Sequence, residues 1–227
     1  MQAVLKYVIV GLALIAPIAT SAEDDRFPEF MVGATAAAFG GWNIFCEDYR
    51  PVCDTKPMPP IVTTLTRSSR AVLEDINRDV NRRITYKTDI EHWGWDNPRY
   101  AHPHVEDVDR WDYAEDGFGD CEDYALLKRE ILIEKGWPRS TLLMTIVHAP
   151  LRIVSYQDGV RSEQIQYRGH MVLTVKTNQG DFILDNEGDD LKRWWQTDYQ
   201  FILRQSQEDP NVWVVLKTSV VVVANIK

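Results

Sequence analysis

The sequence is short of basic residues and contains no repeated or low-complexity tract, and each absence excludes a class of protein. Lysine and arginine number 25 against 34 acidic residues, a formal net charge of −9. The basic surface that nucleic-acid binding requires is therefore missing, so we expect no nucleic-acid partner. The lack of repeats excludes solenoid architectures. The remainder, 44% hydrophobic and 26% charged, has the composition of a globular domain that can bury a core without crosslinks.

Long apolar runs are also scarce, and the longest stands at the N-terminus. Lys6 precedes an almost unbroken apolar stretch over residues 7–16, followed by Pro17 and small residues up to Ala22. This order is typical of a secretory signal cleaved after Ala22. The run is short for a membrane span, although an uncleaved anchor remains an alternative. We therefore expect residues 1–22 to be a signal peptide and the protein to be exported to an oxidising compartment.

Cysteine is scarce, and its number is odd. Cys46 and Cys53 enclose six residues that include a proline, whereas Cys121 stands far from both. In an exported protein this spacing predicts a local disulfide between Cys46 and Cys53. Cys121 is then a free thiol in an oxidising space, and its retention there favours a chemical role.

The order of the remaining elements predicts an α+β domain. Residues 23–60, rich in Gly, Ala and Pro, form an expected extended lead-in to a domain over residues 61–227. Apolar residues at helical spacing predict a helix over residues 64–83. Residues 85–119 are long, polar and aromatic, which is typical of a functional loop, and His102 and His104 within it match no closed zinc pattern.

Beyond Gly136 the apolar period changes from helical to alternating, which predicts strands. The expected strands cover residues 142–146, 151–156, 169–175, 181–186, 199–203 and 212–216. Because the helices precede the strands, we expect N-terminal helices packed on an antiparallel sheet.

Cys121 lies at the start of a second predicted helix, in the stretch Gly119-Asp120-Cys121-Glu122-Asp123-Tyr124-Ala125. Asp120 can cap this helix together with Asp123 three residues later. Free N–H groups and the positive end of the helix dipole lower a thiol pKa and bind an oxyanion there. Most free cysteines are inert core residues, so the position alone leaves both interpretations open.

A predicted hairpin brings an imidazole and a carboxylate together. A turn over residues 178–180 makes His170 and Asp185 near neighbours across the ladder, within about one diagonal pair. A carboxylate beside an imidazole fixes its tautomer, and the imidazole can then take a proton from a thiol and return it to a leaving amine. Periodicity does not by itself bring Cys121 to His170.

The stretch at Cys121, together with Gly169-His170-Met171-Val172-Leu173 and Ile183-Leu184-Asp185-Asn186, resembles the signature of bacterial transglutaminase-like cysteine peptidases, a group that includes the periplasmic LapG proteases. The resemblance implies a papain-like, transglutaminase-core domain in the periplasm. It makes Cys121 the nucleophile, His170 the general base and acid, and Asp185 the residue that orients it. It also implies a protein substrate, as LapG proteases cleave a surface adhesin under the control of an inner-membrane regulator.

The acids beside Cys121 disfavour a thiolate, so something must offset their charge. Calcium suits such hard oxygen ligands and reverses the local charge. The same resemblance assigns Asp120 and Glu122 as calcium ligands, because LapG proteases bind calcium through the acids that flank their cysteine. The alternative is that these acids only cap the helix.

Three functions fit the residues. The first is an exported cysteine endopeptidase that acts through an acyl-enzyme. The second is a transglutaminase or amidase with the same triad, which sequence does not separate because only the acceptor differs. The third is a non-enzymatic calcium-dependent binding module in which Cys121 is structural.

Overall fold

The computed structural model describes residues 30–38, 40–94 and 109–217. The predicted signal peptide and the pair His102 and His104 lie outside the described residues. Within those residues no helix is long and apolar enough to cross a membrane.

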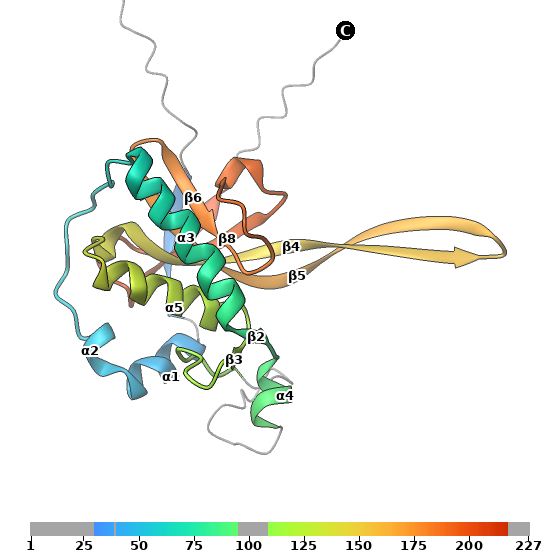
Figure 1. Ribbon diagram of the computed structural model, residues 1–227, viewed down its shortest axis with the longest axis horizontal. Coiled ribbons are helices and arrows are strands. Elements are labelled where there is room, and N and C mark those ends of the chain that lie inside the picture. The colour runs from blue at the N-terminus through green and yellow to red at the C-terminus, as the bar shows by residue number, and fades with distance from the viewer. Residues whose placement is uncertain (1–29, 39, 95–108, 218–227) are drawn as a thin grey trace, which may run out of the picture.

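One seven-stranded antiparallel sheet organises the fold, with the order β1-β9-β8-β4-β5-β6-β7. Two strands near its centre are much longer than the rest and form a hairpin that projects from the body (Figure 1). The strands are β1 (Met31–Ala36), β4 (Leu142–Gln157), β5 (Val160–Thr177), β6 (Gly180–Leu184), β7 (Lys192–Arg193), β8 (Gln200–Gln205) and β9 (Trp213–Lys217).

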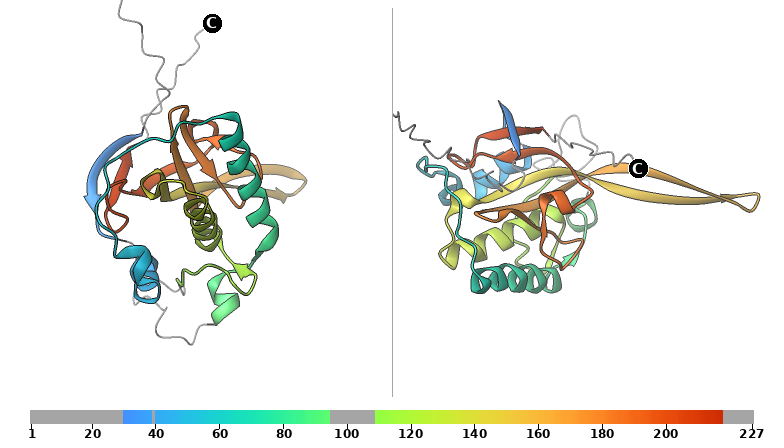
Figure 2. Two further views of the ribbon diagram at one scale, coloured as in Figure 1. Left: turned by 60° about the vertical axis from the view of Figure 1, so that its left-hand side comes forward. Right: turned by 90° about the horizontal axis from the view of Figure 1, so that it is seen from above.

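Two long helices cover one face of the sheet in successive layers. Helix α5 (Cys121–Glu134) packs on β5 and β4, and α3 (Arg67–Arg83) packs on α5, so that α5 lies between α3 and the sheet (Figure 2). Helix α3 begins at a capping box between Thr66 and Ser69 and buries Leu73, Ile76 and Val80, as its apolar stripe predicts.

A parallel strand pair and a short helix lie near the N-terminal end of α5. Strands β2 (Thr85–Tyr86) and β3 (Phe118–Gly119) form a parallel pair, and α4 (Asp89–Trp93) follows β2. Helices α1 (Gly40–Asp48) and α2 (Arg50–Cys53) precede α3. Strand β3 ends at Gly119, so the β2–β3 pair lies directly before Cys121 at the start of α5.

Apolar residues fill both faces of the sheet. Trp42, Phe45, Leu126, Leu132 and Trp213 belong to a large cluster that also includes the α5 side of β4 and β5. A smaller cluster on the opposite face includes Val147, Val172, Ile183, Trp194 and Phe201. The sheet is consequently a fixed platform for side chains at its edges.

The structure corrects two expectations. Residues 23–60 were expected to be a loop-dominated lead-in, but their described part contains β1, α1 and α2, and β1 pairs with β9 at the sheet edge. The strands expected at residues 142–146 and 151–156 are one strand, β4, which runs through Pro150. Proline is compatible with a strand where its missing N–H points away from the neighbouring strand.

The predicted disulfide is present and joins two helices. Cys46 in α1 and Cys53 in α2 are bonded, whereas Cys121 is free. Because the crosslink closes a short loop, the double variant Cys46→Ser/Cys53→Ser will lose about 2 kcal/mol of unfolding free energy. For a domain of this size, that loss lowers Tm by about 4–8 °C in calorimetry. A Tm equal to that of the wild type would contradict this role.

Candidate active site at the start of helix α5

Cys121 is held at the first turn of α5 by a close backbone approach. The Asp123 carboxylate accepts a hydrogen bond from the Asp120 N–H at 3.2 Å, and Asp120 is the N-cap residue. A Cβ atom at position 119 would lie 2.5 Å from the Asp123 Oδ2 atom. Only glycine therefore fits at position 119, which accounts for the Gly-Asp-Cys sequence at this turn.

His170 and Asp185 make the contact that the hairpin register predicts. The β5–β6 register pairs Thr177 with Gly180 and Leu173 with Leu184, and the His170 Nε2 atom lies 2.9 Å from the Asp185 Oδ1 atom. The His170 side chain is almost fully buried. Its other nitrogen, Nδ1, is buried without a hydrogen-bond partner among the described residues.

Several donors hold Asp185 as a carboxylate. Burial opposes its ionisation, but hydrogen bonds from His170 and Tyr199, the charge of the imidazole and that of Lys128 outweigh burial and lower the pKa of Asp185. The Glu187 N–H also donates to Oδ1 at 3.0 Å. An ionised Asp185 fixes the His170 tautomer that leaves Nδ1 free to accept a proton.

Two asparagines of α3 position the backbone that carries Asp185. The Asp185 N–H donates to the Asn77 Oδ1 atom at 3.0 Å, and the Asn81 Nδ2 group donates to the Asp185 carbonyl at 2.9 Å. The Asn77 Nδ2 group also donates to the Gly188 carbonyl at 2.9 Å. Helix α3 therefore determines where the Asp185 loop lies relative to His170, although it contributes nothing to the site directly.

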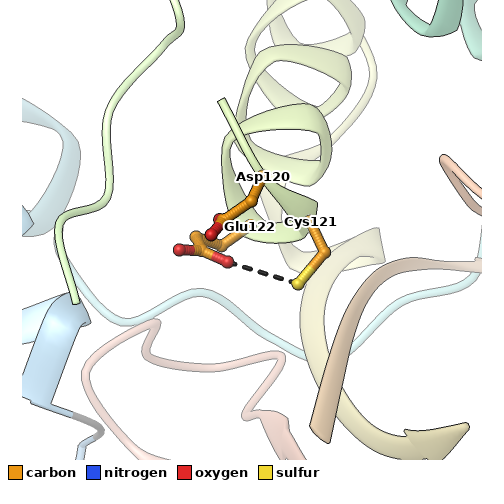
Figure 3. A group of neighbouring side chains, drawn as sticks. All are labelled: Asp120, Cys121 and Glu122. Atoms are coloured by element: carbon orange, nitrogen blue, oxygen red, sulfur yellow. Dashed lines mark hydrogen bonds between the residues drawn. The ribbon is translucent and has the colours of Figure 1, made fainter. Parts of the chain in front are cut away.

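The Cys121 thiol points toward a carboxylate in this structure. Its Sγ atom donates to the Glu122 Oε2 atom at 3.3 Å, and Figure 3 shows the sulfur turned toward Glu122 beside the Asp120 carboxylate. The backbone of Met171, the residue after His170, also hydrogen-bonds to the sulfur. The thiol thus lies beside Met171 of β5, and it keeps its proton, which is directed at Glu122.

The surroundings of Cys121 favour the neutral thiol. Burial is the main cause and the charge of Asp120 adds to it, so that the pKa of Cys121 is raised to about 12 despite the hydrogen bonds to Met171 and Glu122. Burial and the charge of Asp120 likewise raise the pKa of Glu122 well above its ordinary value. Reactivity at neutral pH therefore requires a change in the charge around Asp120 and Glu122.

Asp120 and Glu122 belong to a larger acidic cluster that brings together separate parts of the chain. Possible ligand atoms lie within 4.8 Å of one another in the groups Asp120–Cys121–Glu122, Asp89–Asp109–Glu122 and Asp89–Asp120–Asp123. The Asp120 Oδ1 atom is buried without a hydrogen-bond partner among the described residues. Burial and the Asp120 charge raise the pKa of Asp89 to about 8. Buried carboxylates that lie close together, one of them with an oxygen that lacks a hydrogen-bond partner, form an environment suited to binding a hard cation.

The match to known proteins identifies the family. The family model of the bacterial transglutaminase-like cysteine proteinases matches residues 32–220 of the sequence. The chain belongs to this family. It is therefore a cysteine peptidase, and the non-enzymatic binding module considered above is not retained.

Solved structures similar to this family member include Legionella pneumophila LapG, with 24% identity, a TM-score of 0.42, and 64% of this chain and 67% of that one covered. Calcium-bound Legionella pneumophila LapG is 23% identical with a TM-score of 0.43, and the match covers 67% of this chain and 74% of that one. EGTA-treated Legionella pneumophila LapG is 18% identical with a TM-score of 0.43, and the match covers 81% of this chain and 89% of that one. No curated protein matches the sequence.

Sequence reasoning missed Asp89, Asn77, Tyr199 and Tyr86. Tyr86 belongs to β2, opposite Gly119 in the register. Tyr86 is exposed over much of its surface, but the desolvation of its covered part and the charges of Asp120 and Cys121 raise its pKa to about 12, so its phenol stays protonated beside the site. An isolated tyrosine in an exposed two-residue strand carries no sequence signal of such a position.

Tyr199 offers a direct test of the Asp185 interactions. Its hydroxyl donates to the Asp185 Oδ2 atom, so Tyr199→Phe removes one bond to a charged acceptor and should lower kcat about 3- to 10-fold with little change in KM. The matched control is Tyr113→Phe, which removes a hydroxyl that donates to Glu130. Steady-state kinetics of both variants check the expectation, and equal kcat values would contradict it.

Proposed function

We propose that this family member is an endopeptidase in which Cys121, His170 and Asp185 are the catalytic triad. The observation that carries the proposal is the buried His170, whose Nε2 atom contacts Asp185 and whose Nδ1 atom has no hydrogen-bond partner among the described residues. The next residue, Met171, contacts the Cys121 sulfur through its backbone. This is the arrangement that a base needs in order to act on a neighbouring thiol.

The chemistry follows in two steps. The Cys121 sulfur attacks the substrate carbonyl carbon while the His170 Nδ1 atom takes the thiol proton and then passes it to the departing amine, so that the C–N bond breaks and a thioester forms. Water then gives a proton to His170 and attacks the thioester, which releases the acid and restores Cys121. The N–H groups at the start of α5 stabilise the oxyanion in both steps.

We also propose that the acidic cluster holds calcium, with Asp120 and Glu122 as ligands and Asp89 and Asp109 as further donors. The fit rests on the orphaned Asp120 oxygen and on the mutual proximity of the carboxylates. A bound calcium ion would supply the positive charge that these buried acids lack and that a thiolate at Cys121 needs. A Glu122 carboxylate engaged there is no longer the acceptor of the Cys121 proton, which leaves the His170 Nδ1 atom as the acceptor.

The site of action and the substrate are part of the proposal. The N-terminal pattern over residues 1–22 supports export, and we propose that the enzyme acts in the periplasm. We propose a protein substrate at the cell surface, an adhesin whose cleavage releases cells from a biofilm, and control by an inner-membrane regulator. The basis for the adhesin and the regulator is the resemblance to LapG proteases.

A comparison of envelope peptides from wild-type and Cys121→Ala cells tests the proposed function. The wild type should yield new N-termini from at least one surface protein, and new C-termini that carry ¹⁸O when unlabelled envelope protein is cleaved by the purified enzyme in H₂¹⁸O. Incorporation of an added amine into glutamine side chains would instead identify a transglutaminase. Identical peptide sets in the two strains would contradict proteolysis by Cys121.

A further inference from the structure

The projecting hairpin leaves the edge of β5 open next to Cys121. Strands β4 and β5 pair continuously from Leu142–Val175 to Gln157–Val160. On the other side of β5, strand β6 reaches only as far as the pair Leu173–Leu184. Among the described residues, the outer part of the hairpin therefore has no neighbouring strand on the β5 side, and it extends well beyond the body (Figure 1).

The main-chain groups on this open edge form a row that begins at the Cys121 sulfur. In an antiparallel ladder, successive residues direct their N–H and C=O groups to opposite edges. The backbone of Met171 faces Cys121. By alternation, Gly169, Tyr167 and Ile165 direct theirs to the same open edge, which makes it a template for an added strand.

The opposite edge of the hairpin, along β4, contains a proline that discourages strand addition, and this distinguishes it from the β5 edge. Strand β8 pairs with β4 only as far as His148, and Pro150 follows two residues later. Proline on an edge removes a donor and discourages strand addition. No proline occurs in β5 from Val160 to Thr177. The β5 edge that leads to Cys121 is thus the one whose row of donors no proline interrupts.

One face of the hairpin adds apolar contacts beside that edge. Val154, Tyr156, Ile165 and Tyr167 are all exposed large hydrophobic residues. The register Val154–Glu163 and Arg152–Ile165 places all four on the same face as Met171, because side chains alternate along a strand. Between Tyr167 and Met171, a Cβ atom at Gly169 would meet no atom within 4 Å, so the space on this face is open.

We propose that the open β5 edge, residues 161–169, docks an extended segment of the protein substrate as an added strand whose scissile bond reaches Cys121. This inference rests on the proposed function and narrows the substrate class to unfolded or linker segments with apolar residues at alternate positions. The occupant is the substrate because the row of main-chain groups ends at the nucleophile. Main-chain bonds supply affinity in this mode, and alternate side chains supply specificity.

Two matched proline variants test the edge. Ile165→Pro removes a donor from the β5 edge, and Val154→Pro removes one from the β4 edge, and each also removes one exposed apolar side chain from the same face. Neither proline interrupts the β4–β5 ladder. The backbone N–H groups of Val154 and Ile165, which the prolines remove, point away from the partner strand because N–H directions alternate along a strand. Circular dichroism and thermal unfolding check that both variants fold.

The probe is a phage library of random dodecapeptides selected on Cys121→Ala protein. By fluorescence anisotropy, enriched peptides should bind Val154→Pro/Cys121→Ala a few-fold more weakly than Cys121→Ala, because one apolar contact is lost. They should bind Ile165→Pro/Cys121→Ala at least 10-fold more weakly still, because that variant also removes a main-chain bond to the added strand. Peptides N-methylated at alternate residues, which leave the protein unchanged, should also lose binding. Absence of enriched peptides, or equal weakening by both prolines, would overturn the proposal, as would a wild-type dimer that Ile165→Pro dissociates.

The outcomes separate this inference from the proposed function. If enriched peptides bind the β5 edge but the wild-type enzyme leaves them intact, docking stands and the proteolytic assignment fails. If the wild type cleaves them and the variant carrying Ile165→Pro alone cleaves them at the same kcat/KM, proteolysis stands and docking fails.

Discussion

Replacing His170 with alanine will lower kcat for peptide hydrolysis by about 10³- to 10⁴-fold, the usual contribution of a positioned general base. The effect is large because the pKa of Cys121 is raised to about 12, so the thiol ionises at neutral pH only if a base takes its proton. KM should change little, because the imidazole acts in the transition state rather than in substrate binding.

The control for this variant is His92→Ala. His92 also contacts a carboxylate, Asp116, at 2.8 Å, but it belongs to α4 and lies outside the triad. Its replacement should leave kcat within about 2-fold, which is the range expected for a residue that does not contact the reacting atoms. Retention of more than a tenth of wild-type kcat by His170→Ala would contradict the assigned role.

Adding calcium to the metal-free protein will raise Tm by about 5–10 °C when calcium exceeds its Kd 100-fold, because binding at that excess adds about 2.7 kcal/mol to the unfolding free energy of a domain of this size. The combined variant Asp120→Asn/Glu122→Gln should lose this shift. Asp75→Asn, which alters an exposed acid of α3, should retain it. Differential scanning fluorimetry measures all three proteins. A wild type without a shift, or a full shift in the combined variant, would contradict the calcium site.

The calcium effect should depend on pH in a defined direction. The pKa of Asp89 is raised from 3.8 to about 8 by burial and the Asp120 charge, so the folded metal-free protein holds a proton that the unfolded chain releases. Its unfolding free energy therefore falls as pH rises from about 4 to 8. Calcium competes with such protons, and its stabilisation should be larger at pH 8 than at pH 5.

Local sequence patterns predicted the parts of the site whose geometry is local. The Asn178–Gly180 turn determines the pairing of β5 with β6, and hence the contact of His170 with Asp185. The helix at Cys121 follows from its cap and its apolar spacing. The disulfide follows from the short interval between Cys46 and Cys53. In each case the partners lie within about 15 residues, where turn chemistry or chain length limits the alternatives.

Contacts between distant segments were not predictable in this way. Asp89 joins Asp120 only because β2 pairs with β3, a parallel pair of two residues each that no periodicity reveals. Asn77 is an exception that carries a sequence signal, because it interrupts the apolar stripe between Leu73 and Val80, and the structure buries it fully. A polar residue at a core position requires a partner, here the backbone of Asp185.

The rate of Cys121 alkylation by iodoacetamide, measured from pH 5 to 10 by intact mass, tests most directly whether His170 activates this thiol. With saturating calcium, the wild type should react rapidly at neutral pH. EGTA-treated wild type and calcium-saturated His170→Ala should each react at least 10-fold more slowly at pH 7, because a thiol without an adjacent base or offsetting charge remains protonated there. Equal rates in wild type and His170→Ala with calcium present would contradict the account.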